Sequence, residues 1–257
     1  MKLMARPELK GSPEPFSLLN RIPIRECGEP LVDIREACPQ VLLRPGCLPY
    51  LRQTVAAMLN RAQDSLPDGY RFTVSTALRT LEMQANMYWR NYNRLKEEKP
   101  HLPTSALRRI TNKYFAPPDA KAPPGHTTGG AIDVGLLGPD FRQRDMIAPT
   151  RGWEAAYTWS DLIGPEAKQN RTLIIEALLG AGFSNCRDEW WHWSYGDNAW
   201  SVRTGCAVAI YGLIEPPVGY TFVGKSLKNA PLPNGKYRYL PRVQSIGQRH
   251  LRRNNKS

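Results

Sequence analysis

Two short segments that bring histidines close to carboxylates constrain this chain more than any other feature. One reads GHTTGGAID and the other DEWWHW, and they contain two of the four histidines of the chain. His126 precedes Asp133 by seven residues around a Gly-Gly pair, and Glu189 precedes His192 by three. Two imidazoles and one carboxylate are the usual ligands of a catalytic zinc ion that keeps its fourth position open for water. A second carboxylate, outside the ligand set, is the proton acceptor that such a water needs.

The first segment is expected at a junction between a loop and a strand. His126 follows a Pro-Pro-Gly sequence, and the glycine pair at 129 and 130 permits a sharp turn and a close approach of backbone groups. Asp133 lies between Ile132 and Val134, so a regular strand would point it away from these apolar neighbours. Taken alone, an exposed loop histidine and a solvent-facing aspartate would be the preferred explanation of the two residues.

The second segment is too aromatic for a surface helix and favours a strand over 190–195. Strand alternation would send Glu189 and His192 to opposite faces. Both can reach one site only if Glu189 precedes the strand on a bend or bulge. The neighbouring tryptophans would form a water-poor wall that raises the basicity of Glu189, as a proton acceptor requires.

Arg79 is the remaining candidate for the site. It follows a predicted strand and precedes a predicted helix, where a fixed guanidinium can face a cleft and stabilise an oxyanion. Gln84, five residues later, is a weaker candidate for the same cleft. Without the two histidine segments, Arg79 would be interpreted as one of many surface arginines of a basic chain.

Apolar periodicity predicts an α+β fold, with a small, mainly antiparallel sheet and helices packed on it. At 257 residues the chain can bury its core as one domain. The expected strands cover 31–34, 70–75, 131–134, 190–195 and 207–211, and the expected helices cover 48–66, a segment capped by Thr80, and 165–182. The proline-rich stretch 96–124 is expected to be a surface excursion that leads to His126.

The basic charge of the chain is concentrated at its C-terminal end. Residues 216–257 contain nine Lys or Arg and no Asp or Glu, so they carry +9 of the net charge of +12. This charge pattern predicts a basic extension over 213–257. The irregular sequence rich in Pro and Arg at the other end predicts an N-terminal arm over 1–30, which leaves a catalytic domain over 31–212. The extension could contact an anionic polymer or surface, or it could be a solvated tail. The oligomeric state cannot be deduced from these features.

The compartment is inferred from cysteine usage and from the N-terminal sequence. Five cysteines without a CxxC pair argue against a disulfide framework, and Cys27, Cys38 and Cys47 lack the partners of a zinc-finger site. No apolar run is long enough to span a bilayer, and no secretory signal is visible. We therefore expect a cytoplasmic protein.

At these residues the chain resembles the zinc D-alanyl-D-alanine peptidases, in particular the dipeptidases of the vancomycin-resistance type. The family patterns HxxGxAxD and ExWH are both matched in full, at residues 126–133 and 189–192. The resemblance implies a hedgehog/D-Ala-D-Ala peptidase-like fold and one zinc ion per chain, held by His126, Asp133 and His192. It further implies that Glu189 is the catalytic base, that Arg79 stabilises the transition state, and that the substrate is a small D-amino-acid dipeptide or a muropeptide.

One departure from the family pattern affects the expected substrate. In the resistance-type enzymes a serine two residues before the first histidine helps to hold the amino end of the substrate, but Pro124 stands here and offers neither a hydroxyl nor an N–H. Hydrolysis of D-Ala-D-Ala is the leading hypothesis. A D,D-carboxypeptidase or another muropeptide trimmer is the alternative within the enzymes. A zinc-binding module without turnover is the alternative outside them.

Overall fold

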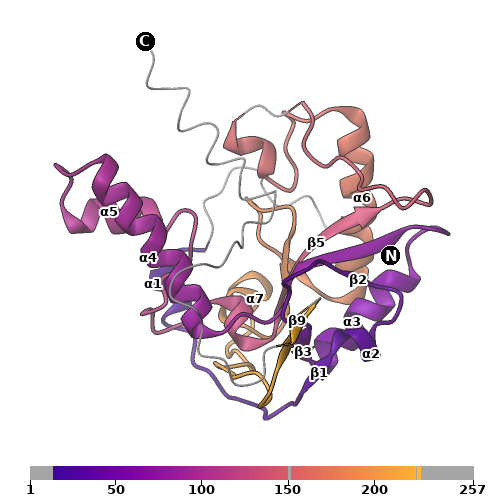
Figure 1. The fold of residues 1–257 in the computed structure, drawn as a ribbon, viewed down its shortest axis with the longest axis horizontal. Helices are drawn as coiled ribbons and strands as arrows, with labels where there is room; N and C mark the ends of the chain where they lie inside the picture. The colour runs from indigo at the N-terminus through magenta and orange to yellow at the C-terminus, as the bar shows by residue number, and fades with distance from the viewer. Residues whose placement is uncertain (1–13, 150–151, 224, 227–257) are drawn as a thin grey trace.

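A five-stranded mixed sheet lies at the centre of the computed structural model, which describes residues 14–149, 152–223 and 225–226 (Figure 1). The helices are α1 (Phe16–Leu19), α2 (Ile34–Ala37), α3 (Gln53–Asp64), α4 (Leu81–Glu98), α5 (Thr104–Thr111), α6 (Pro165–Ala181) and α7 (Asn198–Thr204), and two 3-10 turns are η1 (Gly125–Thr128) and η2 (Trp153–Ala156). The strands are β1 (Leu31–Asp33), β2 (Leu42–Leu43), β3 (Tyr50–Arg52), β4 (Arg71–Thr76), β5 (Ala131–Leu137), β6 (Ser184–Asn185), β7 (His192–Ser194), β8 (Thr221–Phe222) and β9 (Lys225–Ser226).

The strand order of the central sheet is β2-β4-β5-β7-β6. The β2–β4 pair is parallel, and the other three pairs are antiparallel. Two separate antiparallel pairs, β1–β3 and β8–β9, accompany it. The predicted α+β class is confirmed, and β5 occupies the middle of the sheet.

The two faces of β5 have different roles. Ile132, Val134 and Leu136 are at most 3% exposed and belong to the main hydrophobic core, to which α3 and α6 also contribute. Burial of each such side chain stabilises the fold by roughly 1.5–3 kcal/mol. Asp133 alternates with these residues and therefore lies on the opposite face of the sheet. The core thus fixes the strand that presents one of the predicted site residues.

Three predicted helix boundaries are confirmed by the residues at the helix ends. The Thr80 side chain accepts a hydrogen bond from the Met83 amide at 3.1 Å and begins α4. Pro165 is the first residue of α6, and Gly182 ends it in a left-handed conformation with φ of +100°. The start of α4 and the range of α6 are as expected, because these end signals lie in the local sequence.

Four expected elements differ from the structure. The helix expected over 48–66 begins only at Gln53, because Tyr50–Arg52 pair with β1 as strand β3. The strand expected over 190–195 is limited to β7, because the turn from Glu189 extends to His192.

The other two differences lie outside these elements. The segment 207–211 is not a regular strand: Ala209 forms a single bridge with Ile24, because its backbone pairs with the N-terminal arm instead of the sheet. The segment 96–124 is more than a surface excursion, since it contains α5, which packs on the end of α4 through Tyr92, Leu95 and Leu107. Figure 1 shows α4 and α5 projecting together from the rest of the described chain.

The proposed basic extension lies mostly outside the described residues, which end at Ser226. Among the helices that the structure describes, none has the length and apolar composition needed to cross a membrane.

Candidate metal centre

The turn from Gly125 to Gly130 places His126. Gly129 has a left-handed φ of +71°, which a residue with a side chain rarely adopts. Arg52, only 2% exposed, fixes the turn: its amide donates to the Gly129 carbonyl at 3.0 Å and its Nε donates to the Thr128 carbonyl at 2.9 Å. A Cβ at Gly130 would lie 2.5 Å from a backbone oxygen. The glycines are therefore needed for the close approach expected from the sequence.

Asp133 and His192 face each other across adjacent strands. Their Cα atoms are partners in the β5–β7 register, so the two side chains lie on the same face of the sheet. On the other side of β5, Asp133 pairs with Thr76 at a register shift of β4. The sheet thus brings the first and second sequence segments to the same place.

Glu189 lies on a turn immediately before β7. The His192 amide donates to the Glu189 carbonyl at 3.0 Å, which closes the turn. The Asn185 side chain donates to the same carbonyl at 3.3 Å and to the His192 carbonyl at 3.1 Å. The expected bend before the strand is confirmed. Because Glu189 precedes the strand, alternation along β7 does not force its side chain to the face opposite His192.

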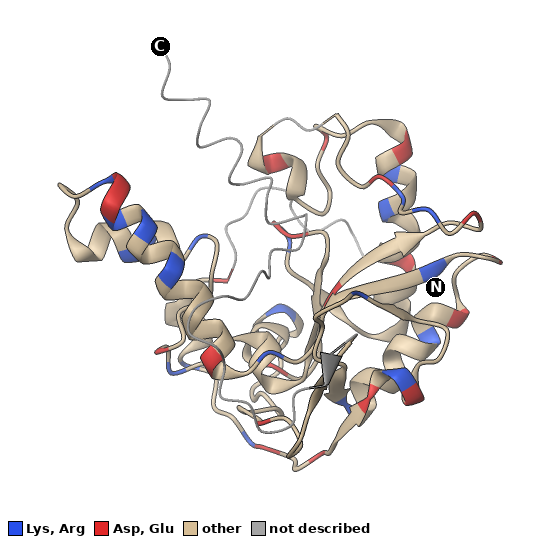
Figure 2. Cartoon of the chain, in the orientation of Figure 1, with Lys and Arg blue, Asp and Glu red and all other residues tan. Residues whose placement is uncertain are grey.

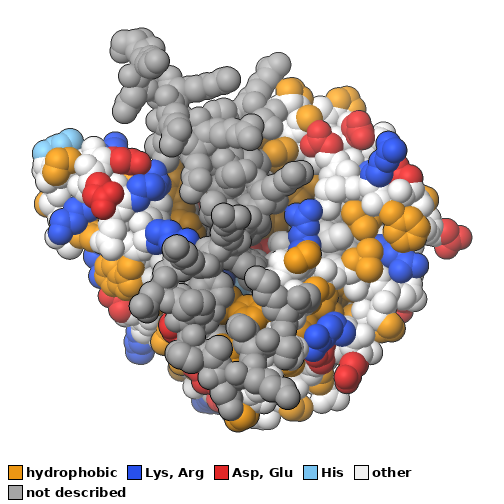
Figure 3. All heavy atoms as spheres, viewed as in Figure 1, with side chains coloured by type: hydrophobic (Ala, Val, Ile, Leu, Met, Phe, Trp, Pro, Cys, Tyr) orange, Lys and Arg blue, Asp and Glu red, His pale blue; other side chains and the backbone are white. Residues whose placement is uncertain are grey.

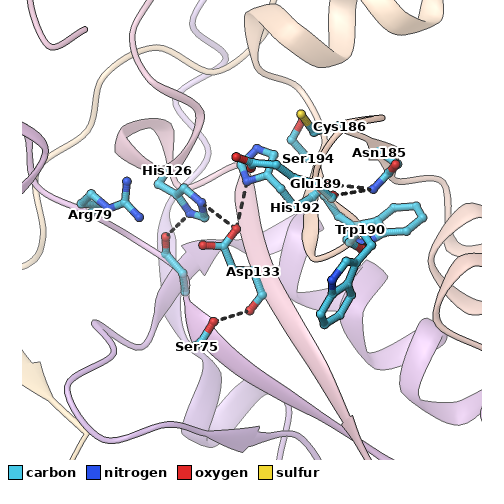
Figure 4. A network of polar contacts seen from close by, with 12 residues as sticks. Ser75, Arg79, His126, Asp133, Asn185, Cys186, Glu189, Trp190, His192 and Ser194 are labelled. Atoms are coloured by element: carbon cyan, nitrogen blue, oxygen red, sulfur yellow. Dashed lines mark hydrogen bonds and ion pairs between the residues drawn. The ribbon is translucent and has the colours of Figure 1, made fainter. Parts of the chain in front are cut away.

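Three donor atoms converge at the centre of this arrangement (Figure 4). Asp133 Oδ1 lies 3.1 Å from His126 Nε2 and 3.0 Å from His192 Nδ1. The three ligand atoms all lie within 4.8 Å of one another. Among the described residues, this is the only cluster of at least three His, Cys, Asp or Glu side chains placed to hold a metal ion.

The chemistry of the donors favours a cation between them. His126 Nδ1 lies 2.9 Å from the Ala77 carbonyl oxygen, so it carries a hydrogen and donates to that oxygen. Burial lowers the pKa of His126 despite the attraction of Asp133, so the neutral imidazole is favoured. The neutral ring then has only a lone pair at Nε2, facing the Asp133 oxygen. A metal ion would use both atoms as ligands, and the Ala77 carbonyl would hold the ring orientation as is usual for ligating histidines.

The pKa values of the other two donors, Asp133 and His192, shift in opposite directions. Burial tends to raise the pKa of Asp133, but the two imidazoles outweigh it and hold the pKa well below its usual range. Burial tends to lower the pKa of His192, but its hydrogen bond and charge attraction to Asp133 raise it overall. The aspartate is therefore ionised, as a ligand must be.

Glu189 is the carboxylate next to the three donors. Burial is the largest cause that raises its pKa, to about 7, and the negative charges of Asp133 and Asp188 act in the same direction. Trp190 and Trp191 are 4% and 9% exposed and belong to the main core, and Trp191 also lines the cavity together with Glu189. A carboxylate with this pKa can both accept and return a proton near neutral pH.

Arg79 and Gln84 line the same cavity as the three donors. The Arg79 amide donates to the His126 carbonyl at 3.0 Å, and its Nη1 donates to the Gln84 Oε1 at 2.6 Å. Gln84 Nε2 in turn donates to the Ala116 carbonyl at 2.7 Å. The guanidinium is 8% exposed and is held at the cavity wall on the His126 side (Figure 4).

The cavity has a volume of about 240 Å³ and also contacts residues that sequence reasoning did not identify. These come from the N-terminal arm, from the turn before β7, from α7 and from the α4–α5 projection, and include Glu14, Asn91, Arg94, Lys113, Cys186, Asp188, Asp197 and Arg203. Glu14 and Arg203 form a partly buried bidentate ion pair at 2.9 and 3.0 Å. Asp188 was visible only as a neighbour of Glu189 in the sequence, and the others carried no local signal.

The cysteines do not form a second metal centre among the described residues. Cys38 and Cys47 are buried and Cys27 is exposed. Burial raises the pKa of both buried thiols to about 12, which disfavours the thiolate that a metal would bind.

Comparisons with known proteins identify a peptidase family. The family model described as D-ala-D-ala dipeptidase, Peptidase_M15, matches residues 54–209. A D-alanyl-D-alanine dipeptidase of Synechocystis sp. is 26% identical over 235 residues, which cover 76% of this chain and 95% of that protein.

Two solved structures are also similar to this chain, with lower sequence identity. VanYB in complex with D-Alanine-D-Alanine is 15% identical with a TM-score of 0.39, covering 62% of this chain and 80% of the other. A mutant of the vancomycin resistance D,D-pentapeptidase VanY in complex with Zn(II) is 15% identical with a TM-score of 0.38, covering 69% and 88%.

Proposed function

The chain belongs to the D-Ala-D-Ala dipeptidase family of peptidases, and on that premise we propose that it is a zinc metallopeptidase that hydrolyses D-Ala-D-Ala. The observation that carries the proposal is the convergence of His126, Asp133 and His192 at one point of a cavity that Glu189 and Arg79 also line. The donor set is that of catalytic zinc sites, which leave one position open.

The three donors would hold one zinc ion per chain. Zinc bound there would supply Lewis-acid polarisation of the scissile carbonyl and activation of the attacking water. Asp133 contributes the negative charge of the ligand set, and the Ala77 carbonyl keeps His126 oriented.

Glu189 would act as the general base and then as the general acid. It takes the proton of the attacking water and returns it to the amine of the leaving residue, as a group with a pKa near 7 can do at neutral pH. The turn that holds its backbone, closed by the His192 amide, keeps it beside the metal donors.

Arg79 would stabilise the oxyanion that forms at the attacked carbonyl. Its guanidinium is oriented by Gln84, and its backbone is tied to His126, so it needs little reorganisation during the reaction. Such preorganised charge is worth several kcal/mol in other enzymes.

A D,D-carboxypeptidase is the second candidate, and Pro124 favours it. Pro124 lines the cavity but has no donor with which to recognise a free amino end. Release of D-alanine from free D-Ala-D-Ala, compared with release from an N-acylated peptide that ends in D-Ala-D-Ala, distinguishes the two activities.

The test of the proposal combines metal analysis with this assay. Purified protein should contain one zinc ion per chain, and a chelator should abolish release of D-alanine, which added zinc should restore. Stoichiometric zinc without hydrolysis of any D-peptide would instead indicate a zinc-binding module. The hedgehog/D-Ala-D-Ala peptidase-like architecture and the domain boundaries at 31 and 212 remain part of this proposal.

A further inference from the structure

One buried side chain, that of Arg52, joins the N-terminal arm to the turn that carries His126. Figure 1 shows the arm, in indigo, passing from α1 along the lower edge of the described chain to β1, and Figure 2 shows acidic positions on this stretch. Arg52 is the last residue of β3, the strand that pairs with β1, and it is only 2% exposed. Its side chain contacts both the arm and the turn and therefore lies between them.

The contacts of the Arg52 guanidinium match its five N–H donors. Nε donates to the Thr128 carbonyl at 2.9 Å. Nη1 and Nη2 donate to the two carboxylate oxygens of Glu26 at 3.0 and 2.9 Å, and also to the carbonyls of Glu29 at 2.6 Å and Gly212 at 3.4 Å. Because the five donors lie in one rigid plane, the bonds to the arm also fix the direction of the bond to the turn.

The ion pair between Arg52 and Glu26 has one buried and one accessible partner. The Arg52 side chain is 2% exposed and the Glu26 side chain 40%. The ring of Tyr211 covers the guanidinium at 4.9 Å from its centre. Removal of one partner from such a pair leaves the buried charge without compensation. A change of the accessible Glu26 therefore acts on a group inside the protein.

The Thr128 carbonyl belongs to a closed turn, so its position determines that of His126. Thr128 Oγ1 donates to the Gly125 carbonyl at 2.7 Å and accepts from the Gly130 amide at 3.1 Å. His126 lies between the two ends of this loop. A shift of the Thr128 carbonyl would therefore change the direction of the imidazole.

We propose that Glu26 and Arg52 are positioning residues, which hold the turn so that His126 points toward the other two metal donors. The inference rests on the proposed function, because it assumes that these donors bind zinc. Both residues lie outside the segment 54–209 that the family model matches. The arm, expected from the sequence as an element separate from the catalytic domain, is thus a part of the metal centre.

The test measures the zinc affinity of Glu26→Gln by competition with a chelator whose absorbance reports bound zinc. Glutamine keeps the length of the side chain but removes its charge and one acceptor oxygen. Loss of a group that orients a metal ligand lowers metal affinity by roughly 10- to 100-fold, and we expect about tenfold here because Glu26 acts through Arg52. Arg52→Lys keeps the charge without the planar fork and should weaken zinc binding at least as much. Since Glu26 is largely accessible, its variant should fold even if Arg52→Lys does not.

The matched control is Asp140→Asn. Asp140 accepts from Arg144 at 2.6 Å, its side chain is 46% exposed, and it follows the end of β5 that is opposite to the metal donors. Figure 3 shows basic and acidic side chains interspersed on the visible face of the described chain, so the loss of one surface charge should change little. The control should bind zinc as tightly as the wild-type protein. Wild-type affinity of Glu26→Gln, or an equal loss in both variants, would overturn the proposal.

Hydrogen exchange of the metal-free proteins gives a readout that does not depend on zinc. The amides of Thr127 and Gly130 are bonded within the turn. In Glu26→Gln, exchange over residues 125–130 should be about tenfold faster, because the turn opens more easily, while exchange in α6 should not change. Equal acceleration in α6 would indicate a general loss of stability and overturn the positioning role. If the wild-type protein binds no zinc, the proposed function fails, and this experiment alone decides: unchanged exchange over 125–130 overturns the inference.

Discussion

Replacing Glu189 by glutamine should separate catalysis from metal binding. Glu189 is not one of the three donors that lie within 4.8 Å of one another, so Glu189→Gln should retain one zinc ion per chain. A positioned general base contributes about 10²- to 10⁴-fold, so kcat for D-Ala-D-Ala should fall by that factor. At 1.36 kcal/mol for each factor of ten, this is a loss of roughly 2.7–5.4 kcal/mol of transition-state stabilisation.

The same variant should be more stable than the wild-type protein when both are free of metal. Burial raises the pKa of Glu189 from 4.5 to about 7, so the folded protein binds this proton more tightly than the unfolded chain. Wild-type stability should therefore fall as pH rises from about 4.5 to 7, and the loss should be complete above 7. The shift corresponds to about 3 kcal/mol, and partial exposure of the side chain reduces the expected gain at pH 8 to about 1–3 kcal/mol.

Thermal unfolding of both chelated proteins at pH 5 and pH 8 measures this gain. Each kcal/mol should raise Tm by roughly 2–4 °C for a chain of about this size. The difference between the proteins should be large at pH 8 and small at pH 5. Near-normal turnover of Glu189→Gln would refute the role of Glu189 as the base. A metal-free variant less stable than the metal-free wild-type protein at pH 8 would show that the ionised Glu189 carboxylate does not destabilise the fold.

Three further variants test the framework of the site. His192→Ala should lose most of its zinc on dialysis, measured by elemental analysis, and stoichiometric zinc would contradict its place in the ligand set. Gly130→Ala should lower Tm and zinc affinity because its Cβ would lie 2.5 Å from a backbone oxygen. The control is Gly180→Ala in α6, where no atom lies within 4 Å of the added Cβ, and it should raise the free energy of unfolding by about 0.4–1 kcal/mol. Glu14→Gln breaks the partly buried pair with Arg203 and should cost about 2–4 kcal/mol at pH 7, somewhat less than a fully buried pair. Burial tends to raise the pKa of Glu14, but the charge and hydrogen bonds of Arg203 lower it overall. The stability lost in Glu14→Gln should therefore become smaller as pH falls below 4.5. A loss that stays constant in thermal unfolding from pH 7 to pH 3 would contradict the ion pair.

The donors of the candidate metal centre could be predicted because their positions depend on local rules. Strand alternation placed Asp133 away from the core, and the glycine pair indicated the turn that positions His126. Gln84, a weak candidate in the sequence, lines the cavity because α4 begins at the Thr80 cap. In each case a few adjacent residues determine where the side chain points.

The rest of the cavity could not be predicted because its walls come from contacts between distant segments. Glu14 and Arg203 are 189 residues apart, and neither has a local pattern that indicates a partly buried pair. The strand expected over 207–211 has the right residues, but its backbone bonds to Pro23 and Arg25 of the arm. The helix α5 lies in a proline-rich stretch, packs on α4 and precedes the residues 112–116 that line the cavity.

The turn before β7 explains why the proposed base and the proposed ligands come from different kinds of structure. Metal ligands must hold fixed distances, and the proposed ligands Asp133 and His192 obtain them from a direct pairing of two strands in the sheet. A base must approach the same point without binding the metal, which a residue at the paired position of the strand could not do. Glu189 meets this requirement because its turn is closed by the His192 amide and the Asn185 side chain, so its carboxylate is directed independently of the strand register. The spacing of three residues in ExWH is therefore explained by a turn that leads into a strand, whereas on a helix the same spacing would place both side chains on one face.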